Sequence, residues 1–191
     1  MHHLPNCHGS PMPGGQIPNR YESLRPAAAE GITYFWRTVL NQKPFMQWQA
    51  AMAATGQVRF REQAYYHMTV LFSRDFIPAE TGLNTLADVK PLLHKNPTFV
   101  SISGIEVWND HKDREIIVAR VLKTDMLQQR HDTLKSLGIK PTFDYKPHIT
   151  LCSHDEYVPD IPAAAALART LLVGQTILLS KEKAVVSVAR I

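Results

Sequence analysis

The chain has 191 residues, of which 45% are hydrophobic and 20% charged, a composition typical of a soluble globular protein with a core. The net charge of +4 is a mild basic excess that favours an anionic ligand without identifying one. The two cysteines, Cys7 and Cys152, do not make a disulfide framework, which favours a reducing compartment. No apolar run approaches the ~20 residues that a membrane-spanning helix needs, so we expect no membrane partner.

The first part of the chain differs from the rest. Residues 1–30 are rich in Pro, Gly, Asn and His and lack apolar periodicity, so we expect an extended or disordered tail there and one domain over 31–191. The tail has no charged segment followed by an apolar one, as a signal peptide would, and we expect a cytoplasmic protein. Its histidines and cysteine fit no closed zinc pattern, so we expect no metal site and no cofactor.

Hydrophobic patterning predicts the elements of the first half. Pro44 stands near the start of a run of good helix formers, a position that proline favours. Pro91 must end or kink a later segment with only partial helical spacing. The elements expected here are a strand at 31–36, a helix at 44–55, strand at 58–60 and 65–72 with a break at 61–63, and a helix at 83–94.

The second half repeats the strand and helix pattern. Thr124 or Asp125 can cap a helix that Gly138 ends, and Pro162 suits the first turn of another helix. The sum is an α+β domain whose strand-helix-strand pieces recur in two halves. The elements expected here are a hairpin of 99–108 and 115–122 around the polar turn 109–113, a helix ending at Gly138, a strand at 145–153, a helix at 162–172, and a second hairpin of 175–179 and 184–189.

The pattern His-apolar-Thr-apolar occurs twice inside predicted strands, at 67–70 and at 148–151. Because strand side chains alternate between two faces, the His and Thr of each copy point to one face and the apolar residues to the other. One copy is weak evidence, but two copies in matching strands of two halves are much rarer by chance. The alternative is two polar strand faces whose histidines are structural. We favour a site made of His67, Thr69, His148 and Thr150.

These residue types suit cleavage of a phosphodiester without a metal. The reaction needs a base for the attacking oxygen and an acid for the leaving oxygen, and histidine can serve as either near neutral pH. Threonine hydroxyls can donate to the non-bridging phosphate oxygens, where negative charge builds up. The sequence has no acidic cluster of the kind that holds magnesium.

The paired motifs and the two-part α+β layout resemble the 2H phosphoesterase superfamily over about residues 31–190. The resemblance implies two pseudo-symmetric lobes of antiparallel sheet with outer helices around a central cleft. The flanking residues are similar, more narrowly, to phage anti-CBASS nucleases, which degrade cyclic di- and trinucleotide messengers of bacterial immune systems. This implies hydrolysis of 3′–5′ linkages through attack by the ribose 2′-hydroxyl, in the host cytoplasm if the chain is phage-encoded. The segments that carry the narrower resemblance are 66–74, 105–108, 129–134, Gly138 and 143–151.

Four further residues are candidates for substrate binding. Trp108, at the end of a predicted strand, could stack on a nucleobase or cover the edge of the sheet. Tyr34 could reach a ligand, although core packing is the commoner role of a strand aromatic. Arg74 follows the first motif strand and Lys146 precedes the second, so either could attract phosphate or lie on a solvated surface. Cys152 is interpreted as a buried small residue and not as a nucleophile.

Three functions are open at this level. The first is a metal-independent phosphodiesterase for cyclic oligonucleotides that counters CBASS signalling. The second is a 2H enzyme acting on 2′,3′-cyclic phosphate ends or tRNA-derived RNA. The third is a binding module that holds a small nucleotide without cutting it. None of them calls for DNA as a partner, and the residues do not indicate an oligomeric state.

Overall fold

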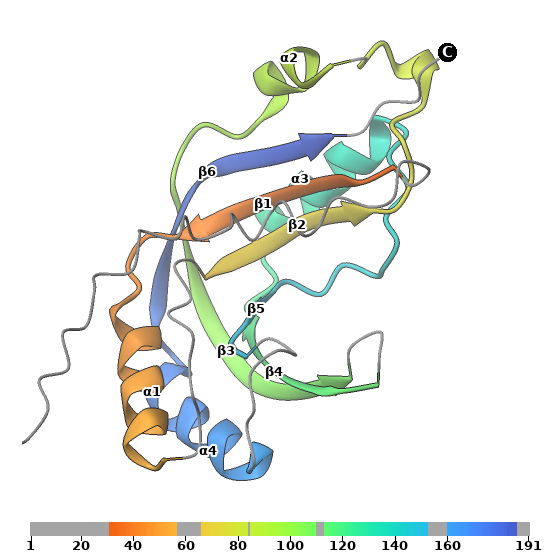
Figure 1. Cartoon of the computed structure of the whole chain (residues 1–191). Helices are drawn as coiled ribbons and strands as arrows, with labels where there is room; N and C mark the ends of the chain where they lie inside the picture. The colour runs from red at the N-terminus through yellow and green to blue at the C-terminus, as the bar shows by residue number, and fades with distance from the viewer. Residues whose placement is uncertain (1–30, 57–65, 84, 110–112, 153–159, 187–191) are drawn as a thin grey trace, which may run out of the picture.

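The computed structural model describes residues 31–56, 66–83, 85–109, 113–152 and 160–186. The expected tail, the strand at 58–60 and the end of the expected last hairpin lie outside these ranges. Figure 1 shows the order of the elements along the chain. They are β1 (Thr33–Val39), α1 (Lys43–Ala54), β2 (His67–Ser73), a 3₁₀ turn (Ala79–Thr81), α2 (Leu86–Val89), a second 3₁₀ turn (Lys90–Leu92), β3 (Thr98–Asn109), β4 (Glu115–Val121), α3 (Asp125–Ser136), β5 (His148–Thr150), α4 (Ile161–Leu172) and β6 (Thr176–Val186).

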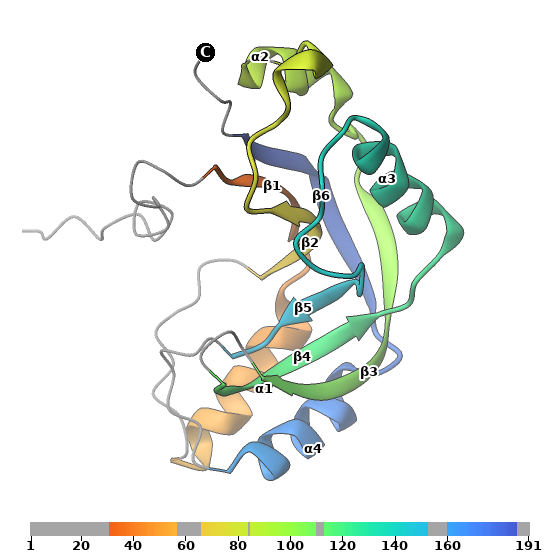
Figure 2. The ribbon, with the colours of Figure 1, turned by 90° about the vertical axis from the view of Figure 1, so that its right-hand side faces the viewer.

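The strands form one closed antiparallel sheet in the order β1-β2-β5-β4-β3-β6. This confirms the α+β class. The sheet is a single barrel, within which two three-stranded halves can be distinguished: β6-β1-β2 and β3-β4-β5. Figures 1 and 2 show α1 and α4 side by side at one end of the barrel and α3 toward the other. The indole N–H of Trp48 on α1 donates to the carbonyl of Ala164 on α4 at 3.2 Å, which ties these two helices together.

The helix boundaries follow the caps that the sequence offers. Thr124 accepts a hydrogen bond from the N–H of Leu127 at the start of α3, and Gly138 has a φ of 83° just after the helix ends. Asp160 caps α4 in the same way. The helix expected over 83–94 is shorter, because Pro91 falls in the 3₁₀ turn that follows α2.

One expected element is wrong: there is no second hairpin in the described part of the chain, since β6 runs without interruption over Thr176–Val186. The polar residues around 180–183 resemble a turn in sequence. In the structure they find partners on other elements, and the strand therefore continues. The hydroxyl of Ser180 accepts from the backbone N–H of Thr38 at 3.0 Å, Glu182 binds Arg130, and the ammonium of Lys183 donates to the Thr38 hydroxyl at 3.2 Å.

Candidate active site

The two motif strands, β2 and β5, are neighbours in the barrel. They pair antiparallel, with Met68 opposite Ile149. In this register each motif's histidine lies opposite the other motif's threonine, His67 across from Thr150 and His148 across from Thr69. Met68 and Ile149 are both 0% exposed, whereas the four polar residues are half-buried, so the His/Thr quartet shares the face that points away from the core. The two histidines are diagonal neighbours across the strand pair, a relation in which the Cβ atoms lie somewhat less than about 7–8 Å apart.

His148 is held in one orientation. Its Nδ1–H donates to the backbone carbonyl of Lys146 at 2.7 Å, because a carbonyl can only accept. This leaves Nε2 as the nitrogen that can exchange a proton with a ligand. Burial lowers the pKa of His148, and the charge of Arg120 lowers it further, while the Lys146 hydrogen bond and Glu106 oppose the shift.

His67 has a different environment. Burial lowers its pKa, and the charge of His148 lowers it further. The ring of Tyr34 meets the imidazole edge to face, with centroids 6.1 Å apart. The Tyr34 hydroxyl lies 3.2 Å from the Thr69 hydroxyl, within hydrogen-bonding distance. Tyr34 is therefore on the quartet face and half-buried, where a ligand on that face would meet it.

Trp108 also lies at the quartet. Its ring centroid is 4.6 Å from that of His148. Its indole N–H donates to Glu106 at 2.7 Å, and the guanidinium of Arg120 lies 5.5 Å from the ring centroid. Arg120 in turn donates to both carboxylate oxygens of Glu106 at 3.1 Å. These contacts hold the indole beside His148. The hydrogen bond from Trp108 also lowers the pKa of the Glu106 carboxylate, and it is the largest cause of that shift.

Sequence reasoning missed Glu106 and Arg120. Arg120 reaches the quartet because β4 pairs with β5 and Arg120 lies opposite His148. Its partner Glu106 stands on β3, opposite Val118. The predicted hairpin of these two strands held one usable signal, since opposite charges on facing strands of a hairpin often pair. Nothing in the sequence placed that hairpin next to the second motif.

The two basic candidates lie differently. The side chain of Lys146 is exposed, and its backbone carbonyl orients His148. Arg74 is exposed just past the end of β2, roughly 16 Å along the strand from Thr69 at 3.3 Å per residue. Its backbone N–H donates to the hydroxyl of Thr142 at 2.9 Å. The structure thus brings Lys146 next to the quartet and places Arg74 at the far end of the strand. A phosphate-binding role stays a prediction for both.

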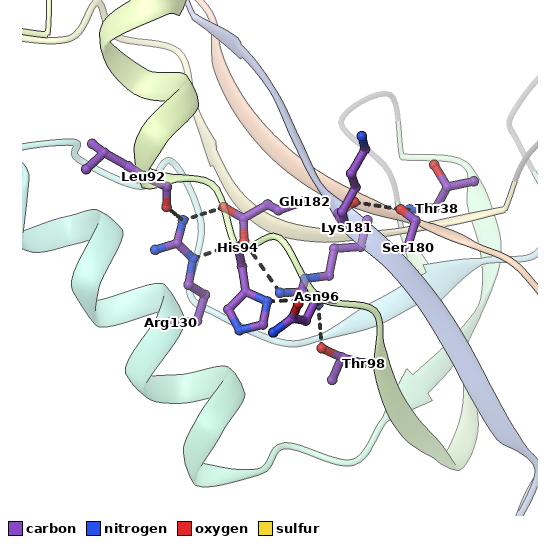
Figure 3. A network of polar contacts seen from close by, with 10 residues as sticks. Thr38, Leu92, His94, Asn96, Thr98, Arg130, Ser180, Lys181 and Glu182 are labelled. Atoms are coloured by element: carbon purple, nitrogen blue, oxygen red, sulfur yellow. Dashed lines mark hydrogen bonds and ion pairs between the residues drawn. The ribbon is translucent and has the colours of Figure 1, made fainter.

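A buried ionic network lies on the other side of β1, beneath α3 (Figure 3). The carboxylate of Glu182 receives two hydrogen bonds from Arg130, and Arg37 lies 3.9 Å away. Arg37 also donates to the Thr98 hydroxyl at 2.6 Å, and burial lowers its pKa despite Glu182. A cavity of about 180 Å³ adjoins this network and is separate from the quartet. Its lining comprises Arg37, Val70, His94, Met126, Leu127, Gln129, Arg130 and Thr133.

The neighbouring α3 residue has a structural role too. His131 is buried, and its Nδ1–H donates to the carbonyl of Val70 at 2.9 Å. Its ring stacks on Tyr145, with centroids 4.3 Å apart, and burial raises the pKa of Tyr145. Arg130 and His131 thus fix α3 to the sheet. Cys152 is buried as well, at 2% exposure.

The described residues contain no group of three or more His, Cys, Asp or Glu side chains placed to hold a metal ion. No helix in the same ranges has the length and apolar character needed to span a membrane.

Fold and site together define a class of protein: an antiparallel α+β barrel whose neighbouring strands present two facing His-x-Thr motifs. A family model for the anti-CBASS protein Acb1 matches residues 32–180, which include both motifs and most of the chain. The chain therefore belongs to this anti-CBASS family, and the match supports a role in antagonising CBASS signalling. A search of curated proteins found no match.

Proposed function

We propose that the chain is a metal-independent 2H phosphodiesterase that hydrolyses the 3′–5′ linkages of cyclic di- and trinucleotide messengers. The observation that carries this proposal is the pairing of Met68 with Ile149, because it gathers two imidazoles and two hydroxyls on one half-exposed face. The family match supplies the biological setting, in which degrading such messengers would silence CBASS.

The quartet suits a two-step reaction. In the first step one imidazole takes the proton of the ribose 2′-hydroxyl while that oxygen attacks phosphorus. The other imidazole gives a proton to the departing 5′-oxygen, so the 3′–5′ bond breaks and a 2′,3′-cyclic phosphate forms. In the second step the two imidazoles exchange roles, water opens the cyclic phosphate to a monoester, and both rings return to their starting protonation.

Charge builds up on the non-bridging oxygens during both steps. The hydroxyls of Thr69 and Thr150 can donate to these oxygens from opposite strands, which stabilises the charge without a metal ion. The lowered pKa values of both histidines keep a neutral ring available as base at mildly acidic pH. A bound phosphate would raise both pKa values, because its negative charge favours imidazolium, and so would supply the acid.

The test is incubation with a panel of cyclic di- and trinucleotides in EDTA, with the products identified by mass spectrometry. We expect linear products from the wild-type protein and none at matched times from His67→Ala or His148→Ala. His94→Ala is the matched control, since His94 lines the cavity under α3 and its Nδ1 lies 3.2 Å from the Asn96 carbonyl. Full activity in either quartet variant would overturn the proposal.

Two other outcomes would replace the proposal with its alternatives. A preference of 100-fold or more for 2′,3′-cyclic nucleotides, about 2.7 kcal/mol in the transition state, would make RNA ends or tRNA-derived RNA the substrate. Tight binding of cyclic oligonucleotides with no product over hours would make the chain a binding module.

A further inference from the structure

An exposed aromatic pair, Phe72 and Phe143, extends the quartet face beyond Tyr34. Phe143 is 62% exposed, yet its ring stacks on Phe72 of β2 with centroids 6.1 Å apart and planes 14° apart. Single exposed apolar residues are ordinary on protein surfaces. A phenylalanine that stacks on a second ring and leaves its own outer face open is different, because it offers a flat apolar surface of nucleobase size.

The strand register places this pair on the same face as the quartet. Phe72 lies opposite Tyr34, and the two rings meet edge to face with centroids 5.9 Å apart. Tyr34 reaches Thr69 with its hydroxyl. On the other side of Tyr34 lies Val185 of β6, which is 47% exposed. Tyr34, Phe72 and Phe143 therefore form a continuous aromatic shelf that begins at the quartet and runs outward along β2.

The loop before β5 holds Phe143 in place. The backbone N–H of Thr142 donates to the carbonyl of Phe72 at 2.9 Å. The hydroxyl of the same threonine accepts from the backbone N–H of Arg74 at 2.9 Å. These two hydrogen bonds fix the residue before Phe143 to the end of β2. The loop therefore does not have to become ordered before a base can stack on the outer face of the Phe143 ring. A platform that is already fixed loses little entropy when a base stacks on it.

Distance separates the shelf from Trp108. Trp108 contacts His148 directly, so it lies next to any phosphate held by the quartet. Phe72 is three residues beyond Thr69, roughly 10 Å along the strand, and Phe143 lies one ring further out. In a cyclic dinucleotide both nucleosides are bonded to the scissile phosphate. In a cyclic trinucleotide one nucleoside is not, and its base extends away from the bond being cut.

We propose that Phe72 and Phe143 bind the nucleobase remote from the scissile phosphate and so favour cyclic trinucleotides over cyclic dinucleotides. This inference rests on the proposed function, because it names the ring size that the same site prefers. Aromatic stacking accepts every base, so the shelf selects ring size and not base identity.

The experiment compares kcat/KM for one cyclic trinucleotide and one cyclic dinucleotide in Phe143→Ala, Phe143→Trp and the wild type. Phe143→Ala is expected to lose about tenfold on the trinucleotide and less than about twofold on the dinucleotide. Phe143→Trp is expected to keep both values, because it restores a flat ring. Phe99→Ala is the matched control, since Phe99 is a 70% exposed phenylalanine elsewhere in the barrel, at the start of β3. An equal loss on both substrates, or no loss on either, would overturn the proposal.

Binding measurements separate this inference from the proposed function. Dissociation constants for both ring sizes are measured by calorimetry in a His67→Ala background, with and without Phe143→Ala. A tenfold weaker constant for the trinucleotide alone supports the shelf even if the wild-type protein cuts neither substrate. Unchanged constants rule the shelf out even if the wild-type protein cuts both.

Discussion

The two halves of the barrel carry the same motif in different surroundings. His148 has its Nδ1–H fixed by a carbonyl and a charged pair beside it, Arg120 and Glu106. The pKa of His67 is lowered by burial and by the charge of His148. Each half also has an arginine–glutamate pair. In the His148 half the pair lies on the quartet face, with side chains 24% and 47% exposed, and in the His67 half Glu182 is fully buried behind β1.

This difference indicates that a repeated motif sets the position of each histidine but not the groups that shift its pKa. Alternation along a strand puts the His and Thr of both copies on the same face of the sheet. The neighbours that tune each ring come from other strands, and they are not repeated. The half with a buried pair uses its charges to anchor α3 to the sheet. The half with an exposed pair places its charges where they act on a histidine.

The largest expected effect is the loss of either histidine. His67→Ala and His148→Ala should each lower kcat by about 10²–10⁴, the usual contribution of a general acid or base. The double variant should be little worse than either single one, because the rings act as a unit. Thermal melting should stay near the wild-type value, since both rings are half-exposed. Additive losses in the double variant would show that the two halves work independently.

Removing the charge of the buried glutamate should give the next largest effect. Glu182→Gln leaves Arg37 and Arg130 near a neutral amide and should lower the free energy of unfolding by about 3–5 kcal/mol. Glu106→Gln is the matched control on the other half, and it should cost under ~1 kcal/mol, because that pair faces solvent. Urea denaturation measures both. Equal losses would contradict the distinction between an anchoring pair and a tuning pair.

The threonines should contribute somewhat less than the histidines. Thr69→Val and Thr150→Val keep the shape of the side chain and remove the donor, which should lower kcat by roughly 10²-fold each. The Thr69 hydroxyl also lies within hydrogen-bonding distance of the Tyr34 hydroxyl. Tyr34→Phe removes that contact but keeps the Thr69 donor, so it should lower kcat only severalfold. Steady-state kinetics measures kcat for each variant. An unchanged kcat in Thr69→Val would show that the Thr69 hydroxyl does not stabilise charge on the phosphate oxygens.

Local patterns predicted most of the fold and the quartet itself. Alternation placed His67 and His148 with their threonines, and caps such as Thr124 set the helices. The predicted hairpin at β6 was wrong because the polar residues taken for a turn have their partners on β1 and α3, which are distant in sequence. Glu106 and Arg120 were missed for a related reason, because their role depends on the pairing of β4 with β5. Phe143 lies in a loop, where no periodicity indicates which surface a side chain joins.

The smallest expected effect, and the sharpest test of the asymmetry, is the pH dependence. The pKa values of both histidines are lowered, so kcat/KM, which reports the free enzyme, should peak below the ordinary imidazole pKa of about 6.5. The folded protein should also lose stability as pH falls below that value, because the unfolded chain binds protons more readily.

Glu106→Gln removes a charge that raises the pKa of His148, so the limb of the kcat/KM profile that reports His148 should move to lower pH. Arg120→Met should move the same limb to higher pH. Shifts in the same direction for both variants would show that the exposed pair does not act on His148 through its charges.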